Sequence, residues 1–324
     1  MLTVVTYHYV RALEGSGFPR LKARTLESFK GQLDYIARHY TVVGIRNVIA
    51  AVDGVPLPTN ALLLTFDDGL RDHATNVLPQ LKSRGMVGCF FVPTSVLTQR
   101  TLLSVHKLHC VLAMAEHPSS LLQTLFAYLR PWRSSVALPS DEELFQRFGS
   151  GTPFRFDTPE VACVKTLLQR ELPSEVRENI LDALFESVVH RDEGEVAGEF
   201  YMNSDDLRAL LDSGMDIGGH GTTHRWLGAL SKRQQQVEID GTISMLKLFG
   251  LLPDRWAMSY PLGNYNSDTI ALLKDSGCAA AFTTRQAVIE SFEARYELPR
   301  LDTNDLPVDA NAPQKDWTMA NPRG

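Results

Sequence analysis

Short apolar runs rich in β-branched and aromatic residues recur along the chain, and amphipathic helical patterns separate them. The strand-like runs lie at residues 3–7, 41–45, 62–66, 87–92, 215–218, 256–260, 279–284 and 296–301. This alternation is typical of βα units built on a parallel sheet. The number of runs predicts an α/β fold of the closed or nearly closed barrel type, in which functional groups lie on the loops that follow the strands.

Local signals mark the ends of several helices. Thr25 is suited to cap a helix, because its hydroxyl can accept a hydrogen bond from one of the first backbone N–H groups. Gly85 follows a later helical pattern, at the position where a left-handed residue ends many helices. The helix that Thr25 would cap has one apolar stripe, formed by Leu26, Phe29, Leu33 and Ile36.

The alternation of strands and helices is interrupted from about residue 95 to 200, where the sequence contains helical patterns but no convincing strand. Its clearest helices lie at 102–129 and 174–190. We interpret the region as a helical insertion that caps the site rather than as an independent domain. The barrel with its insertion is expected to span residues 1–302. The segment 303–324 is rich in Asn, Asp and Pro and is expected to be a C-terminal tail that wraps the surface or is disordered.

Composition narrows the cellular context. The 324 residues carry a formal net charge of -6 with a pI near 5.9, and no Lys/Arg block stands out, so we expect no nucleic-acid partner. No apolar stretch is long enough for a transmembrane segment, and the first seven residues look like a strand rather than a secretory signal. Together with four widely spaced cysteines, which we expect to be reduced core residues, these features predict a cytoplasmic protein. The cysteines are Cys89, Cys110, Cys163 and Cys278.

The first chemical motif is a pair of adjacent carboxylates. The apolar run 62–66 ends in Asp67-Asp68-Gly69, which places both acids where a buried strand meets a turn. Two carboxylates near a core repel each other unless a cation or a proton compensates them. Because Asp-Gly is also a common turn dipeptide, the motif taken alone is equally consistent with a solvated turn.

A second motif follows the strand-like run 215–218. It consists of two glycines and then His220 and His224, which are four positions apart. A helical turn or a tight loop puts residues at this spacing on one face, so both imidazoles can reach a single ion. Adding one aspartate from the first motif gives two His and one Asp, with positions left open for water or substrate. This donor set predicts a catalytic divalent site rather than a closed structural one.

Three segments together resemble NodB-like polysaccharide deacetylases (carbohydrate esterase family four). Residues 65–69, Thr-Phe-Asp-Asp-Gly, are similar to the family's first motif, and residues 220–224, His-Gly-Thr-Thr-His, to its second, with Gly in place of Ser or Thr. Residues 260–263, Tyr-Pro-Leu-Gly, are similar to the third. The motifs occur in the family's order, and the resemblance covers roughly residues 2–300 apart from the insertion. It implies a distorted (β/α) barrel of about seven strands.

The resemblance also implies roles for individual residues. A divalent metal would be held by Asp68, His220 and His224; zinc is the default, although cobalt, nickel or iron would accept the same ligands. Asp67 would act as the general base toward a metal-bound water. The backbone N–H of Leu262 would stabilise the oxyanion that forms on the acetyl group.

Two departures from the family's pattern concern catalytic groups. Ser259 stands where family members usually carry the arginine that orients the base. Arg300, at the end of the last predicted strand, is our candidate to replace that arginine, although it could instead pair with another group at the barrel rim. Many members also have a late histidine that protonates the leaving amine, but no histidine follows His224 in this sequence.

Further residues are candidates for contacts with the substrate. His8 ends the first predicted strand and can face the site, and Tyr260 and Pro261 belong to the third motif. His106 lies on an insertion helix that could bring it over the site as the missing acid, although exposure or packing within the insertion explains it more simply. Core packing explains Tyr260 equally well.

The preferred hypothesis is therefore a metal-dependent carbohydrate N-deacetylase that acts on an N-acetylated sugar or glycan precursor. The covered site and the missing secretory signal favour a small or carrier-linked precursor over an extracellular polymer. Two alternatives stay open. The same site could hydrolyse another amide, such as a formamide or a cyclic ureide, or the chain could be a glycan-binding homologue without activity. Asp67 argues against the second alternative, because a metal site used only for binding needs no base.

Overall fold

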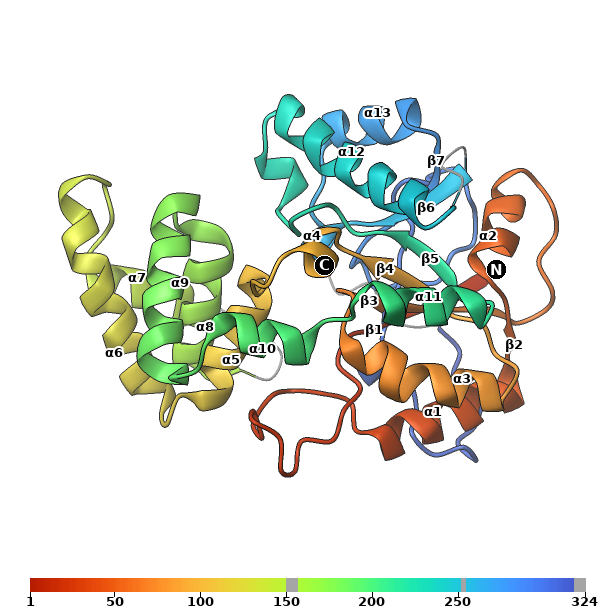
Figure 1. Ribbon diagram of the computed structural model, residues 1–324, viewed down its shortest axis with the longest axis horizontal. Helices are drawn as coiled ribbons and strands as arrows, with labels where there is room; N and C mark the ends of the chain where they lie inside the picture. Colours follow the sequence, from red (N-terminus) through yellow and green to blue (C-terminus); the bar gives the residue numbers. More distant parts are fainter. Residues whose placement is uncertain (150–156, 252–254, 318–324) are drawn as a thin grey trace. The chain divides into compact units, whose positions relative to one another are not determined.

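The fold is organised around one sheet in which all strands run parallel (Figure 1). The computed structural model describes residues 1–149, 157–251 and 255–317. The strands are β1 (Leu2–Tyr7), β2 (Thr41–Val42), β3 (Ala61–Asp67), β4 (Cys89–Val92), β5 (Asp216–Gly219), β6 (Trp256–Ser259), β7 (Cys278–Phe282) and β8 (Leu301–Asp302). Their order is β7-β6-β5-β4-β3-β1-β8, and β2 pairs with the first residues of β3. The predicted α/β fold class, a distorted (β/α) barrel, is confirmed.

The sheet curls into a barrel that one short segment helps to close. Phe282 of β7 pairs with Leu298, and three residues later Leu301 pairs with Val5 of β1. The segment 298–302 therefore passes from one edge of the sheet to the other. The strand predicted at 296–301 is consequently wrong for most of its length, because Pro299 lacks a backbone donor at the point where the segment changes partners.

Helices between the strands cover the outside of this sheet. They are α1 (Leu26–His39), α2 (Ile45–Val52), α3 (Leu78–Ser83), α4 (Ser95–Thr98), α11 (Ser204–Asp212), α12 (Lys232–Leu248) and α13 (Ser267–Asp275), with the short helical segments η1 (His73–Val77) and η6 (Pro261–Gly263). The predicted cap of α1 is present, since the Thr25 side chain accepts a bond from the backbone N–H of Ser28. The buried face of α1 also agrees with the predicted stripe, because Phe29, Leu33 and Ile36 are fully buried.

The two faces of β3 have different surroundings. Every residue of β1 and β3 is buried, as expected for central strands of a parallel sheet that is covered on both faces. Leu63 belongs to an apolar cluster with Phe91 and Phe282, whereas Phe66 packs against the ring of Phe29 from α1. Because side chains alternate along a strand, Asp67 shares its face with Leu63. A carboxylate thus ends the row of side chains that faces the apolar cluster.

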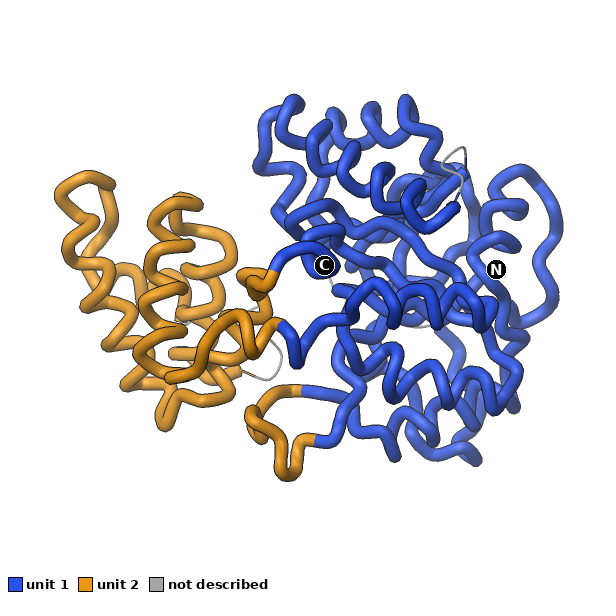
Figure 2. The backbone as a smooth tube through the Cα atoms, in the orientation of Figure 1, with its two compact units in different colours: residues 1–12, 23–99, 198–324 blue, residues 13–22, 100–197 orange. Residues whose placement is uncertain are grey.

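Contacts within the chain divide it into two compact units (Figure 2). Residues 1–12, 23–99 and 198–324 form the unit that contains the sheet, and residues 13–22 and 100–197 form the other. The second unit contains α5 (Ser104–Met114), α6 (Pro118–Leu129), α7 (Asp141–Gly149), α8 (Pro159–Thr166), α9 (Ser174–Val189) and most of α10 (Glu193–Phe200). Its described residues include no strand, in agreement with the sequence pattern. Residues 150–156 of the predicted insertion lie outside the described ranges.

One helix predicted in this region is in fact two. The predicted helix 102–129 is interrupted between α5 and α6, where Pro118 takes the first position of α6. Proline is favoured there because its missing N–H would have no partner inside the helix. Across the described residues, none of the helices has the length and apolar character that a membrane span requires. The four cysteines are buried and form no disulfide.

The described part of the C-terminal tail runs along α1. The side chain of Gln32, which is fully buried, donates to the carbonyl groups of Thr303 and Leu306 at 2.7 and 3.0 Å. Further along, the indole of Trp317 donates to the hydroxyl of Tyr40 at 2.9 Å. Residues 303–317 therefore wrap the surface; residues 318–324 lie outside the described ranges.

The tail approaches α1 so closely that one helical position tolerates no side chain. A Cβ atom added at Gly31 would lie 2.1 Å from the carbonyl oxygen of Val308. Alanine has a higher helix propensity than glycine, but its Cβ atom would force the tail to shift. Gly31→Ala should therefore lower the free energy of unfolding by about 1–3 kcal/mol, measured by urea titration. Gly198→Ala in α10 is the matched control, since no atom lies within 4 Å of the added Cβ and stability should be unchanged or higher. Equal effects of the two substitutions would contradict the proposed overlap.

Candidate metal centre and active site

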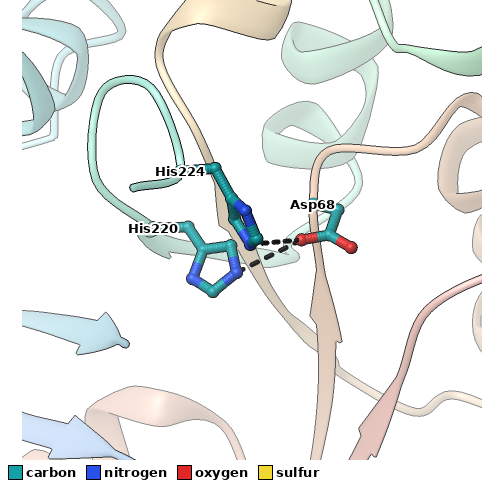
Figure 3. Close-up of side chains that lie close together, drawn as sticks. All are labelled: Asp68, His220 and His224. Carbon is teal, nitrogen blue, oxygen red and sulfur yellow. Dashed lines mark ion pairs between the residues drawn. The ribbon is translucent and has the colours of Figure 1, made fainter. Parts of the chain in front are cut away.

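Three side chains converge where β3 and β5 end, as Figure 3 shows. Asp68 directly follows β3, and His220 directly follows β5. These strands flank β4, and the register pairs Asp67 with Phe91 and Phe91 with Gly218, so the two strand ends lie level with each other. Parallel strands lie about 4.8 Å apart, so side chains from β3 and β5 can meet across the end of β4.

The donor atoms of Asp68, His220 and His224 lie close to one another. The Nε2 atoms of both imidazoles are 3.2 Å from Oδ1 of Asp68, and ligand atoms from the three residues all lie within 4.8 Å of one another. The three residues are 3%, 2% and 8% exposed, respectively. The structure therefore brings the three predicted metal ligands together in one buried cluster.

Hydrogen bonding prepares His220 to bind a metal. Its Nδ1 lies 2.6 Å from the carbonyl oxygen of Ser259. A carbonyl can only accept, so Nδ1 carries the proton and the lone pair of Nε2 points toward Asp68. Burial lowers the pKa of His220, but the negative charges of Asp67 and Asp68 outweigh burial and raise it. Two imidazole nitrogens and one carboxylate oxygen thus fit a divalent cation and leave coordination positions open.

The backbone around the cluster adopts a conformation that few residue types favour. Among the described residues, five that are not glycine have positive φ angles, and three of these are Asp68 (78°), His224 (59°) and Leu262 (56°). Positive φ brings Cβ close to the backbone and costs of the order of 1–2 kcal/mol per residue. Such conformations are common at functional sites, where the surrounding structure holds them in place.

Asp67 lies beside the cluster but has a different partner. Its two carboxylate oxygens accept bonds of 2.9 and 2.7 Å from the guanidinium of Arg300, and the hydroxyl of Ser259 donates to Oδ2 at 3.0 Å. Asp67 and Arg300 are 1% and 2% exposed. Burial alone would raise the pKa of Asp67, but the charge of Arg300 outweighs it and lowers the pKa to about 2. Asp67 is therefore a permanent carboxylate at physiological pH.

Arg300 reaches Asp67 from the segment that closes the barrel. It also donates to the hydroxyls of Thr65 and Ser259 and to the carbonyl of Thr283. The small Ser259 side chain occupies the position where the family usually carries arginine, and the guanidinium comes instead from residue 300. The predicted contact between Arg300 and Asp67 is thus present.

His8 is the third histidine that approaches the carboxylate of Asp68. It follows β1, its Nε2 lies 3.9 Å from Oδ2 of Asp68, and its side chain is 47% exposed. His73, which shows no catalytic signal in the sequence, holds the backbone here, since its Nε2 lies 3.0 Å from the carbonyl oxygen of His8. Burial lowers the pKa of His73 to about 4, so it is neutral at physiological pH.

Two more side chains support the same loop. The carboxylate of Asp72 accepts bonds from the N–H of Val10 at 3.1 Å and from Nε of Arg11 at 2.7 Å, and the amide of Asn76 donates to the carbonyl of Val10 at 2.8 Å. Most of these partners are backbone groups, which leave no signal in a sequence. The polar residues in the first helical turns after the Asp-Asp-Gly motif are the signal that could have identified this support, but the sequence analysis assigned them no role.

The other predicted site residues have different surroundings. Tyr260 is 1% exposed, donates to the carbonyl of Tyr296 at 2.9 Å and stacks on Tyr265, so it has a place in the core. Pro261 and Leu262 form the short η6 turn after β6. His106 lies on α5 in the helical unit, and its contribution to the site stays a prediction.

Comparisons with known proteins agree with the geometry of the site. Residues 172–281 match the model of the polysaccharide deacetylase family, and the resemblance to NodB-like deacetylases is confirmed. No curated protein sequence matches the chain. Three solved structures, all below 25% sequence identity, share the fold. The structures show the fold, and the family match is the comparison that supports glycan deacetylation as the broad activity.

The three structures come from bacteria and align along most of their length. Deacetylase PplD from Streptococcus pyogenes, in complex with acetate, has a TM-score of 0.56 at 14% identity and covers 93% of this chain and 91% of its own. IcaB from Ammonifex degensii has a TM-score of 0.54 at 18% identity, with coverage of 93% and 90%. The BpsB deacetylase domain from Bordetella bronchiseptica has a TM-score of 0.52 at 16% identity, with coverage of 93% and 95%.

The buried pair of Asp67 and Arg300 should dominate the stability of this region. Arg300→Met leaves a buried carboxylate without its cation and should lower the free energy of unfolding by about 3–5 kcal/mol, and Asp67→Asn should have an effect of the same sign. The double variant should lose less than the sum of the two, because neither charge is then left alone. Guanidinium titrations of the four metal-free proteins measure this coupling. Additive losses would show that the two groups do not stabilise each other.

Proposed function

We propose that this chain is a metal-dependent carbohydrate N-deacetylase that removes the acetyl group from an amino-sugar or glycan precursor. The observation that carries the proposal is the separation of two adjacent carboxylates. Asp68 faces two imidazoles in a buried cluster, while Asp67 pairs with Arg300 and stays outside that cluster. The match to the polysaccharide deacetylase family supports the substrate class.

The donor set of Asp68, His220 and His224 is suited to zinc, and cobalt, nickel or iron would accept the same atoms. Such an ion supplies Lewis-acid activation of a water molecule and of the acetyl carbonyl. The protein's contribution is to orient the donors. The hydrogen bond from His220 to the carbonyl of Ser259 fixes the tautomer, and burial keeps competing water away from the cluster.

Asp67 is the proposed general base. As the water oxygen adds to the acetyl carbon, Asp67 accepts the proton that the water loses. Arg300 holds both carboxylate oxygens, so it orients the base and keeps it ionised. The backbone N–H of Leu262 is the proposed donor to the developing oxyanion.

His8 is the proposed general acid, which the sequence leaves unassigned. When the C–N bond breaks, the amine nitrogen needs a proton before it can leave. His8 is partly exposed, lies 3.9 Å from Asp68 and has its backbone fixed by His73. It can therefore exchange protons with solvent and donate one to the leaving amine.

The substrate is proposed to be a small or carrier-linked precursor rather than an extracellular polymer, and the reaction is proposed to take place in the cytoplasm. The helical insertion favours the first statement, and the four buried cysteines, which form no disulfide, agree with the second. Activity toward short N-acetylated sugars that exceeds activity toward the corresponding polymer would support the first statement.

Acetate release from N-acetylated amino-sugars tests the proposal directly. The metal-loaded protein should release acetate, chelation should abolish release, and Asp67→Asn should lower kcat by about 10²–10⁴-fold with unchanged metal content. Asp216→Asn, which alters a partly buried carboxylate at the opposite end of β5, is the matched control and should keep kcat. N-formyl sugars and cyclic ureides belong in the panel. Hydrolysis of these compounds alone would assign the protein to another amide. Sugar binding by the metal-loaded wild type without any acetate release would indicate a binding protein.

The role of His8 can be separated from a structural role by the choice of leaving group. His8→Gln should lower kcat for N-acetyl sugars by about 10²–10⁴-fold, but it should have little effect on an aryl acetate, whose phenolate leaves without a proton. His39→Gln serves as the control because His39 ends α1, next to the opposite end of the sheet. An equal loss on both substrate types would assign His8 to binding or to structure instead.

A further inference from the structure

The loop between the two metal-ligand histidines is held by a buried carboxylate on a neighbouring helix. Glu238 of α12 is 5% exposed, and its Oε2 accepts hydrogen bonds from the backbone N–H groups of Thr222 and Thr223 at 2.7 and 2.8 Å. Its other oxygen, Oε1, accepts a bond from the hydroxyl of Thr223. One side chain thus satisfies three donors from two consecutive residues of the loop.

The loop also packs directly on the backbone of α12. The hydroxyl of Thr222 donates to the carbonyl of Glu238 at 2.9 Å. A Cβ atom added at Gly241 would lie 2.0 Å from this hydroxyl oxygen. A glycine inside a helix costs about 1 kcal/mol relative to alanine, and this close approach accounts for its presence.

The opposite side of the loop is held by the segment that begins α4. The backbone N–H of Ser95 donates to the carbonyl of Thr222 at 2.8 Å, and that of Thr94 donates to the carbonyl of Gly221 at 3.2 Å. The hydroxyl of Thr94 bonds the carbonyl of Gly241 at 3.2 Å, so this segment also contacts α12. The carbonyl groups of Gly221 and Thr222 therefore bond the segment that begins α4, whereas the N–H groups of Thr222 and Thr223 bond Glu238.

This arrangement matters because the two histidines are supported differently. His220 directly follows β5 and is fixed by its bond to Ser259. His224 lies outside any helix or strand and has a positive φ angle, so the loop must hold it in place. Without the carboxylate, the N–H groups of Thr222 and Thr223 would lose their acceptor, and the loop would relax toward a conformation that satisfies them.

We propose that Glu238 is a positioning residue for the metal centre, which acts by fixing His224 relative to His220 through the loop between them. The inference rests on the proposed metal site, but it does not depend on the identity of the substrate. Partners of metal ligands typically change metal affinity by about 10–100-fold when they are replaced. Glu238 should have an effect of this size, although it contacts neither imidazole directly.

The test is the affinity for Co²⁺ or Zn²⁺, measured by competition with a chelator on the full-length protein. Glu238→Gln keeps the size of the side chain but replaces one acceptor oxygen with an amide that can only donate. We expect its metal dissociation constant to rise about 10–100-fold. Hydrogen exchange of the Thr222 and Thr223 amides in the metal-free protein should also become faster, because their acceptor is weakened.

Gln235 provides the matched control on the same helix. It is fully buried, bonds the carbonyl of Leu230 and contacts Asn266 and Thr269 rather than the metal loop. Gln235→Ala should lower the melting temperature and leave metal affinity within about twofold of the wild type. If Glu238→Gln and Gln235→Ala lowered affinity in proportion to their loss of stability, Glu238 would be merely structural and the proposal would be overturned.

A milder variant tests the proposal if Glu238→Gln fails to fold. Thr223→Val removes only the hydroxyl bond to Glu238 and keeps the backbone bonds, so it should weaken metal binding in the same direction but less than Glu238→Gln. Unchanged affinity in both folded variants would refute the positioning role while the proposed function stood. If the wild-type protein bound neither ion, the proposed metal site would be refuted, and both proposals would fail together.

Discussion

Two neighbouring carboxylates at the end of one buried strand can be tolerated only if each has its own source of positive charge. In this chain the strand's alternation and the left-handed turn at Asp68 direct the two side chains to different partners. Asp67 pairs with a guanidinium, and Asp68 lies with two imidazoles in a cluster suited to a divalent cation, which would supply the second positive charge. The proposed division of roles, with Asp67 as base and Asp68 as metal ligand, follows from this separation. Either acid without its partner would be a buried charge that costs several kcal/mol.

The irregular backbone of the site depends on the regular structure around it. Asp68, His224 and Leu262 each follow a strand at a short distance and each adopt a positive φ angle. The strands supply rigid starting points, and side chains from the neighbouring helices restrain the turns. The polar groups near the site therefore fall into two sets, one that directs chemistry and one that satisfies the backbone of the turns.

Much of the fold and of the cluster was predictable from the sequence, because the signals were local. Most strand runs, the cap at Thr25 and the His-x-x-x-His spacing are contained in short windows, and these features appear in the structure. Features that depend on tertiary contacts were less accessible. The last predicted strand fails where the chain changes partners at Pro299, and the long insertion helix fails at Pro118, whose role as a helix start was not recognised. Glu238 was missed because its partners are backbone amides.

Arg300 has both a structural role and a role in the proposed active site. It belongs to the segment that joins the two edges of the sheet, and it is also the counter-ion of the proposed base. During synthesis on the ribosome, this segment emerges after every strand of the barrel except β8. The ligand cluster can thus assemble before its neighbouring carboxylate is compensated. A nascent chain is therefore expected to stay inactive until residues 298–302 dock, so the proposed activity depends on the contact that this segment makes with both edges of the sheet.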